Sequence, residues 1–173
     1  MNSKLKLLLV SMVMSISVSA KDWTGSLFPT FELKNQNNEV ITNKNFSDKW
    51  VVYYFYPKDN TPGCSIEAEN FATRYPELLK MGLDVVGISL DDVDSHKSFA
   101  GTYKVKFNLL ADVDKQLSKQ MDIVNYLPWP YTRRETFIVD DKGNIVKHYK
   151  DVDPSTHVEQ IVIDFKALKA TLK

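Results

Sequence analysis

The sequence is short of cysteine, of net charge and of long apolar runs, and each shortage excludes a class of protein. A single cysteine, Cys64, stands among 173 residues, so the chain forms no internal disulfide and lacks the paired thiols of a dithiol oxidoreductase. Lys plus Arg and Asp plus Glu both total 22, so no overall charge attracts nucleic acid or an anionic membrane. The apolar stretch 7–18 is shorter than the roughly 20 residues of a membrane-spanning helix.

The first twenty residues have the three parts of a secretory signal peptide. Lys4 and Lys6 form a basic start, the apolar stretch 7–18 follows, and Val18-Ser19-Ala20 supplies a cleavage site. We therefore expect a signal peptide over residues 1–20, cut after about Ala20, and a periplasmic or secreted product without membrane attachment. A buried N-terminal helix is the alternative.

Residues 21–173 show no repeat, no low-complexity tract and no linker, which indicates one domain. Apolar periodicity and turn residues predict strands over 31–33, 39–41, 50–55, 84–90, 108–111, 136–139 and 145–149. They predict helices from Cys64 to Gly82, from a cap at Asp94 or Ser95 to Tyr103, over 115–121, and from Pro154-Ser155 onward. Alternating strands and helices followed by a hairpin predict an α/β protein with a thioredoxin-like fold, a central mixed sheet flanked by helices on both faces.

Cys64 follows a predicted central strand, 50–55, and a turn, 57–63, and stands where a helix begins. Ligand sites gather at this carboxyl edge of the sheet in open α/β folds. Free N–H groups and the positive end of the helix dipole stabilise an anion there, so we expect the sulfur to react as a thiolate. Its neighbours are Gly, Pro, Ser and Asn, which argues against an inert core cysteine.

The residues around Cys64 resemble those of a known family. Pro57, Thr61 and Cys64 fit the Pro-x-x-x-Thr-x-x-Cys motif of peroxiredoxins, and the whole string 56–67 resembles the bacterioferritin comigratory protein, or PrxQ, branch. Segments 85–90 and 134–140 resemble the family's Val-x-Gly-Ile-Ser and Arg-x-Thr-Phe-Leu-Ile-Asp segments. The resemblance implies an antioxidant thiol peroxidase that reduces hydrogen peroxide and organic hydroperoxides.

The resemblance also implies a role for each site residue. Cys64 is the nucleophile that a hydroperoxide oxidises to sulfenic acid. Thr61 is expected to bond the thiolate and the peroxide, Pro57 to wall the pocket, and Arg134 to offer its charge and donors to both. Glu67, one helical turn after Cys64, either orients Arg134 or faces solvent.

Several alternatives stay open beside these roles. Arg133 adjoins Arg134, although the family spacing favours Arg134, and Thr61 and Pro57 can serve as turn formers only. The strongest rival to the enzyme is a non-enzymatic thioredoxin-like module that uses Cys64 for mixed-disulfide docking or redox sensing. Docking requires neither Thr61 nor Arg134, so the sequence favours the enzyme.

The sequence departs from the branch in lacking a resolving cysteine. Many relatives carry one five residues after the first, where Glu69 stands here. An external thiol must then regenerate Cys64, and a thioredoxin-like protein, a glutaredoxin and a small thiol are the candidates. We expect a monomer or a homodimer.

Two further features remain outside the motif. His96, His148 and His157 show no metal-ligand spacing, so we expect surface or capping roles for them, no metal site and no cofactor. The aromatic, proline-stiffened segment 126–131 forms a collar for bulky hydroperoxides, a docking surface or local packing over a loop. We favour local packing.

Overall fold

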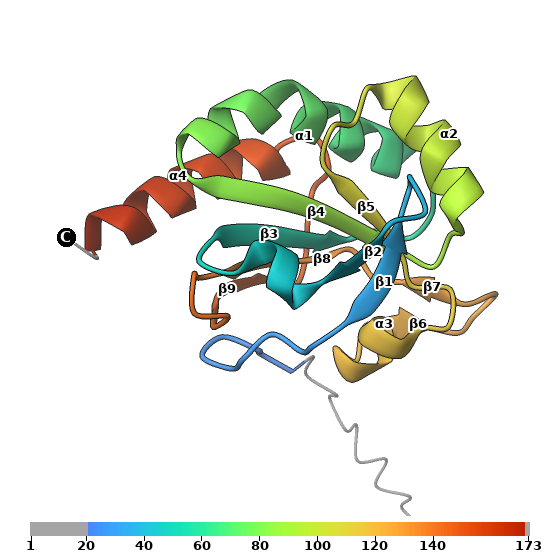
Figure 1. Cartoon of the computed structure of the whole chain (residues 1–173), viewed down its shortest axis with the longest axis horizontal. Coiled ribbons are helices and arrows are strands. Elements are labelled where there is room, and N and C mark those ends of the chain that lie inside the picture. Colours follow the sequence, from blue (N-terminus) through green and yellow to red (C-terminus); the bar gives the residue numbers. More distant parts are fainter. Residues whose placement is uncertain (1–20, 172–173) are drawn as a thin grey trace, which may run out of the picture.

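A seven-stranded sheet forms the centre of the computed structural model, which describes residues 21–171 (Figure 1). The expected signal peptide, residues 1–20, lies outside the described residues. The strands of this sheet are β1 (Glu32–Asn35), β2 (Val40–Thr42), β3 (Trp50–Phe55), β4 (Leu83–Ser89), β5 (Asn108–Ala111), β8 (Glu135–Val139) and β9 (Ile145–Tyr149). A separate hairpin consists of β6 (Val124–Asn125) and β7 (Tyr131–Thr132). The helices are α1 (Pro62–Lys80), α2 (Val93–Tyr103), α3 (Gln116–Gln120), α4 (His157–Thr171) and the short 3-10 helix η1 (Asn43–Phe46).

The sheet is mixed, as the sequence predicts. Its strands lie in the order β2-β1-β5-β4-β3-β8-β9. Strands β3, β4 and β5 are parallel and are joined through α1 and α2, whereas β8 and β9 return as an antiparallel hairpin beside β3. The crossover helices are needed because a tight turn cannot join parallel strands. The predicted thioredoxin-like class is confirmed.

Strand β3 is the centre of the core because all six of its residues are buried. Side chains alternate along a strand. The even-numbered residues of β3 pack beneath α1 and α4, where the ring of Trp50 meets that of Phe165. The odd-numbered residues pack on the other face, with Leu117 of α3 and Phe46 of η1. A strand covered on both faces is apolar throughout, which explains the uninterrupted run that the sequence shows.

None of the four predicted helix starts matches the observed one: α1 begins at Pro62 rather than Cys64, and α3 at Gln116 rather than Lys115. Asp92 caps α2, since its side chain accepts a hydrogen bond from Ser95 N at 2.8 Å, so the prediction of Asp94 or Ser95 as the cap was wrong. Several polar residues stand in a row here, and each can cap a helix. The last helix begins at His157 rather than at Pro154-Ser155, which lie in the preceding turn.

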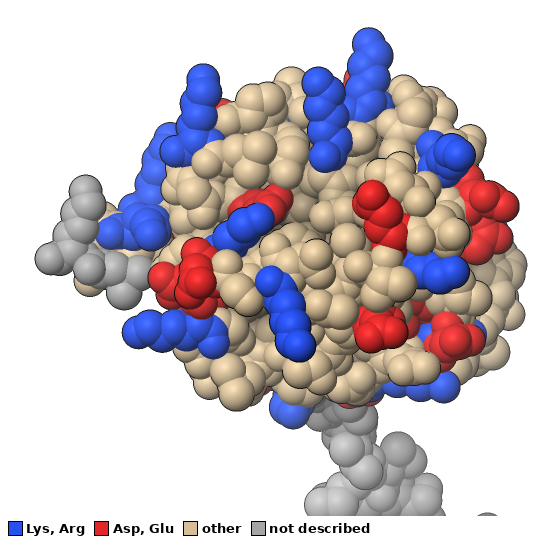
Figure 2. Space-filling model, viewed as in Figure 1, with Lys and Arg blue, Asp and Glu red and all other residues tan. Residues whose placement is uncertain are grey.

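Charged side chains of both signs are interspersed over the face of the molecule seen in Figure 2. None of the helices within residues 21–171 combines the length and the apolar character that crossing a membrane requires.

Candidate active site

The pairing of β3 with β8 brings Cys64 and Arg134 together. Helix α1 begins seven residues after the end of β3, and β8 runs antiparallel to β3 with Glu135 opposite Phe55. Arg134, the residue before β8, therefore arrives at the carboxyl end of β3, which is also where the first turn of α1 lies. Residues 70 positions apart in sequence are neighbours here for this reason.

Cys64 lies in the first turn of α1 and its sulfur faces a guanidinium. The residue is buried, with 1% of its surface exposed, and Arg134 Nη2 donates a hydrogen bond to Sγ at 3.2 Å. The first turn of a helix leaves the N–H groups of Gly63 and Cys64 without an acceptor inside the helix. The sulfur thus lies at the start of a helix and within hydrogen-bond distance of a guanidinium.

Gly63 is the residue that lets Arg134 approach. A Cβ atom at this position would lie 3.3 Å from Arg134 Nη2 and 3.5 Å from Pro154 Cγ. Contacts at 3.3 Å are tight for a side-chain carbon, so any larger residue would push the guanidinium outward. The glycine in the motif has a steric task as well as its place in the helix start.

Glu67 is the second residue that Arg134 binds, besides Cys64. Its side chain is fully buried, Arg134 Nη1 donates to its Oε2, and its Oε1 has no hydrogen-bond partner among residues 21–171. Burial raises the pKa of Glu67 to about 7, although the charge of Arg134 and its hydrogen bond pull in the opposite direction. The alternative of a solvent-facing Glu67 was wrong.

Arg134 remains a cation in this setting. Burial of the guanidinium opposes its charge, but Glu67 and Cys64 outweigh that effect and raise the pKa of Arg134. Arg133 faces elsewhere: its Nε donates to Glu135 Oε1 at 2.7 Å and its Nη2 to the carbonyl of Asp122. The family spacing therefore selects the arginine that contacts the sulfur.

Neither of the other two motif residues has a hydrogen bond to the sulfur within residues 21–171, so the expected bond between Thr61 and the thiolate is not observed. Thr61 is the N-cap residue of α1, yet its hydroxyl donates to the carbonyl of Lys58 at 3.0 Å, and no hydrogen bond joins it to Cys64 in the described part of the chain. Because its proton is committed, this hydroxyl can only accept from a further partner. Pro57, which has no N–H, lies half-buried two residues after the end of β3.

The three histidines have buried side chains, so the prediction of surface or capping roles was wrong. Their partners lie far along the chain: Asp59 for His96, Glu135 for His148 and Thr136 for His157. Burial, followed by the charge of Arg134, lowers the pKa of His157 to about 4, so this ring is neutral at pH 7. No group of three or more His, Cys, Asp or Glu able to hold a metal occurs within residues 21–171.

The aromatic segment 126–131 forms the tip of the β6–β7 hairpin and is mostly exposed. Leu127 is 84% exposed and Trp129 62%, so local packing over a loop, the interpretation that the sequence favoured, was wrong. The base of the hairpin is fixed, since Thr132 Oγ1 donates to the carbonyl of Tyr56 at 2.6 Å. Figure 1 shows the hairpin projecting from the sheet edge at which β3 ends. The strands were missed because each has only two residues.

Comparison with known proteins decides the family. The profile of the AhpC/TSA family matches residues 24–148. The chain belongs to the AhpC/TSA family. Among relatives in this family, a chloroplastic peroxiredoxin Q of Sedum lineare is 37% identical over 154 residues, which cover 88% of this chain and 83% of the relative.

Solved structures of the same family have the same fold. Peroxiredoxin Q of Xanthomonas campestris matches with a TM-score of 0.74 and 30% identity, over 79% of this chain and 90% of the other. Peroxidoxin BcpB of Mycobacterium tuberculosis matches with a TM-score of 0.77 and 27% identity, over 83% and 96%. The predicted PrxQ-like branch and the enzyme class, thiol peroxidase, are confirmed, and the enzyme is preferred to a docking module.

Proposed function

We propose that this AhpC/TSA-family chain reduces hydrogen peroxide and organic hydroperoxides through Cys64 alone, in defence against oxidants. The observation that carries the proposal is the 3.2 Å hydrogen bond from Arg134 Nη2 to Cys64 Sγ at the start of a helix. An inert core cysteine needs neither a buried guanidinium nor the open N–H groups of a helix start.

The reaction begins with attack of the thiolate on the terminal peroxide oxygen. The S–O bond forms as the O–O bond breaks, so Cys64 becomes a sulfenic acid and the peroxide is reduced by two electrons. The departing alkoxide or hydroxide takes a proton from water, which replaces the proton that the thiol released on ionising, and leaves as alcohol or water. Arg134 stays charged throughout and can stabilise the negative charge as it moves from sulfur to the leaving oxygen.

Ionisation of the thiol supplies little of the rate. A free thiol is already a few per cent thiolate at neutral pH, so complete ionisation gains only about 30-fold, or roughly 2 kcal/mol. The remainder must come from donors placed around the breaking O–O bond. Arg134 and the N–H groups of Gly63 and Cys64 are those donors in our proposal.

Thr61 and Pro57 shape the approach of the peroxide in this scheme. The Thr61 hydroxyl donates its hydrogen bond to the carbonyl of Lys58, so its lone pairs accept the O–H of the incoming hydroperoxide and turn the terminal oxygen towards sulfur. Pro57 forms part of the wall without offering a competing N–H. Glu67 holds the guanidinium by Nη1, while Nη2 bonds Cys64.

Because the chain has a single cysteine, external thiols must reduce the sulfenic acid in the second half of the catalytic cycle. A first external thiol condenses with the sulfenic acid, giving a mixed disulfide and water, and a second thiol releases Cys64 and leaves as the oxidised disulfide. A thioredoxin-like protein, a glutaredoxin or a small thiol can supply these electrons. Organic substrates are supported by one structural neighbour, the Xanthomonas campestris bacterioferritin comigratory protein, whose structure is described in connection with its alkyl peroxide reduction activity.

The test uses stopped-flow mixing of reduced protein with one equivalent of cumene hydroperoxide or hydrogen peroxide. Loss of the thiol should be far faster than for glutathione, and Arg134→Ala should slow it by more than the roughly 30-fold that ionisation explains. A wild-type rate equal to that of glutathione would overturn the proposed function. A smaller loss in Arg134→Ala would overturn the role of the guanidinium at the breaking bond.

We also propose that the peroxidase domain, residues 21–173, works in the periplasm or outside the cell. The basic, apolar and small-residue parts of segment 1–20 support export. Expression of the full chain followed by N-terminal sequencing should give a product that starts at about Lys21. A product that retains Met1 and fractionates with cytosolic proteins would overturn the proposal.

A further inference from the structure

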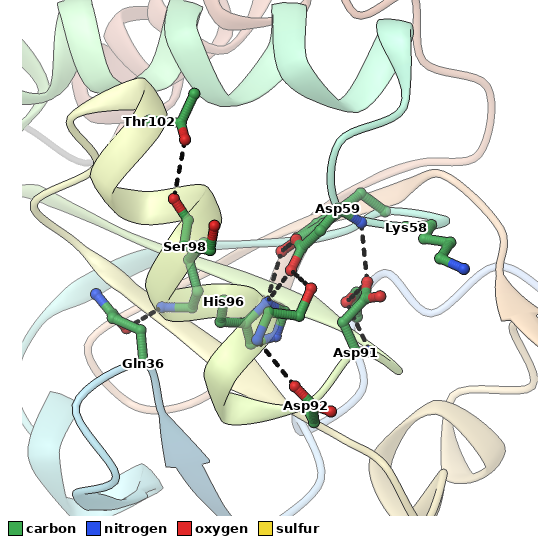
Figure 3. Close-up of polar contacts among 12 residues, drawn as sticks. Gln36, Lys58, Asp59, Asp91, Asp92, His96, Ser98 and Thr102 are labelled. Atoms are coloured by element: carbon green, nitrogen blue, oxygen red, sulfur yellow. Dashed lines mark hydrogen bonds and ion pairs between the residues drawn. The ribbon is translucent and has the colours of Figure 1, made fainter.

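A buried polar cluster lies beneath the turn that precedes Cys64. Lys58 and Asn60 are exposed, whereas the carboxylate between them, Asp59, turns inward and is 2% exposed. Figure 3 shows Asp59 directed at His96 while Lys58 points away. The Asp59 side chain accepts three hydrogen bonds: Oδ1 from Tyr56 Oη at 2.8 Å, and Oδ2 from Ser95 Oγ at 2.8 Å and His96 Nδ1 at 2.9 Å.

The backbone of the same turn is tied to the same part of the sheet. Asp59 N donates to Asp91 Oδ2 at 2.9 Å, and that carboxylate is fixed in turn by Ser89 Oγ at 2.7 Å. The next residues of the turn lead directly to Thr61, the residue at the N-cap position of α1. The turn is therefore held, by side chain and backbone, against the end of β4 and the first turn of α2.

His96 contributes to this cluster in a way that packing does not explain. Nδ1 lies 2.9 Å from Asp59 Oδ2 and 3.3 Å from Tyr56 Oη, and the tautomer with its hydrogen on Nδ1 donates to the carboxyl group. Nε2 is fully buried and has no hydrogen-bond partner within residues 21–171. A buried unpaired polar atom destabilises the fold, and an apolar side chain of similar size would avoid that cost. What the apolar residue could not do is donate to Asp59.

We propose that His96 is a positioning residue of the peroxidase, holding the turn that carries Thr61 through its hydrogen bond to Asp59. The inference rests on the proposed function and adds a residue outside the motif to it. Misplacement of a reacting group by about 1 Å can cost roughly 100-fold in rate. Thr61 follows Asp59 by two residues, so loosening the turn moves the acceptor that orients the peroxide.

Two reactions of Cys64 distinguish a role of His96 in positioning the active-site turn from a role in protein stability alone. Reduction of a peroxide requires the thiolate, Arg134 and Thr61 to be aligned, whereas alkylation by iodoacetamide requires only a thiolate that the reagent can reach. Cys64 is 1% exposed, so a looser turn leaves alkylation unchanged or makes it faster. A positioning defect thus slows one reaction only.

The experiment compares His96→Leu, His96→Asn and His96→Gln with the wild type. Asn carries its amide nitrogen on Cγ, as histidine carries Nδ1, so it can restore the bond to Asp59, while Gln places its amide one bond further out. We expect the second-order rate constant for cumene hydroperoxide to fall roughly tenfold or more in the Leu and Gln variants and to recover to within about threefold in the Asn variant. Alkylation rate constants should not fall in any of them.

Thermal unfolding of each variant shows the folded fraction at the assay temperature. The inference is overturned if the Leu variant loses thermal stability but keeps the wild-type peroxide rate constant, or if a folded Asn variant is as slow as a folded Gln variant. If the Leu variant does not fold, the Asn and Gln pair alone decides the matter. A wild-type protein without rapid peroxide reduction is a different result, because it removes the proposed function before any variant is measured.

Discussion

Replacement of Glu67 by glutamine tests the electrostatics of the active site through protein stability. The carboxylate is fully buried, and among residues 21–171 only one of its oxygens is paired, the one that bonds Arg134. Burial raises its pKa from the ordinary value of 4.5 to about 7. Glutamine keeps an oxygen for Arg134 but cannot ionise.

The size of the effect follows from this pKa. Between pH 4.5 and 7 the native protein holds the Glu67 proton while the unfolded chain has released it, so the contribution of Glu67 to wild-type stability falls as the pH rises through this window. Each pH unit is worth 1.36 kcal/mol, so the shift from 4.5 to about 7 corresponds to about 3 kcal/mol. Above pH 7 the carboxylate is ionised in both states and its contribution no longer changes.

The assay is urea unfolding of reduced wild type and Glu67→Gln at intervals from pH 4.5 to 8. The unfolding free energy of the variant minus that of the wild type should increase by about 3 kcal/mol up to pH 7 and then level off. Glu69→Gln, at an exposed position two residues later, is the matched control and should show no such rise. A difference that is flat across this range would refute the reasoning, because it would mean that the buried carboxylate is ionised throughout.

Two other substitutions address contacts of the same site. Gly63→Ala should lower the peroxide rate constant roughly three- to tenfold without loss of stability, because the new Cβ lies 3.3 Å from Arg134 Nη2. Gly101→Ala is the control within a helix. Its new Cβ would have nothing within 4 Å, so this variant should keep the wild-type rate. A wild-type rate in both would refute the steric role of Gly63. Tyr54→Phe removes a buried hydroxyl that has no partner within residues 21–171, so its urea unfolding free energy should stay within about 1 kcal/mol of wild type or exceed it. A loss above about 2 kcal/mol would show that the hydroxyl is bonded.

Local pattern was enough for the main elements of the fold. The run Trp50–Phe55 was predicted with its observed bounds because a strand buried on both faces has no polar interruption. The hairpin around Gly143 was predicted for a similar reason, since its turn residues are adjacent in sequence. The cap of α2 could not be chosen from sequence, because Asp92 and Asp94 are both suitable there.

Long-range contacts account for what the sequence did not show. Arg134 was named through family resemblance, and the register of β8 against β3, which brings it to Cys64, is a tertiary property. The histidines were misjudged because polar residues are usually exposed, and only distant partners make their burial tolerable: His96 finds Asp59 at a separation of 37 residues. The burial of Glu67 likewise depends on Arg134.

Pairing of β3 with β8 makes the distance between sulfur and guanidinium a property of hydrogen-bond register rather than of chain length. Insertions or deletions in the connection between α2 and β5 or at the β6–β7 tip would leave that spacing intact, because neither segment lies between the two pairing strands in space. A slip of β8 by a single residue would be far more damaging, since it would exchange the faces of every side chain on the strand. The site can therefore tolerate large changes of loop length in its surroundings while tolerating no change of alignment at its centre.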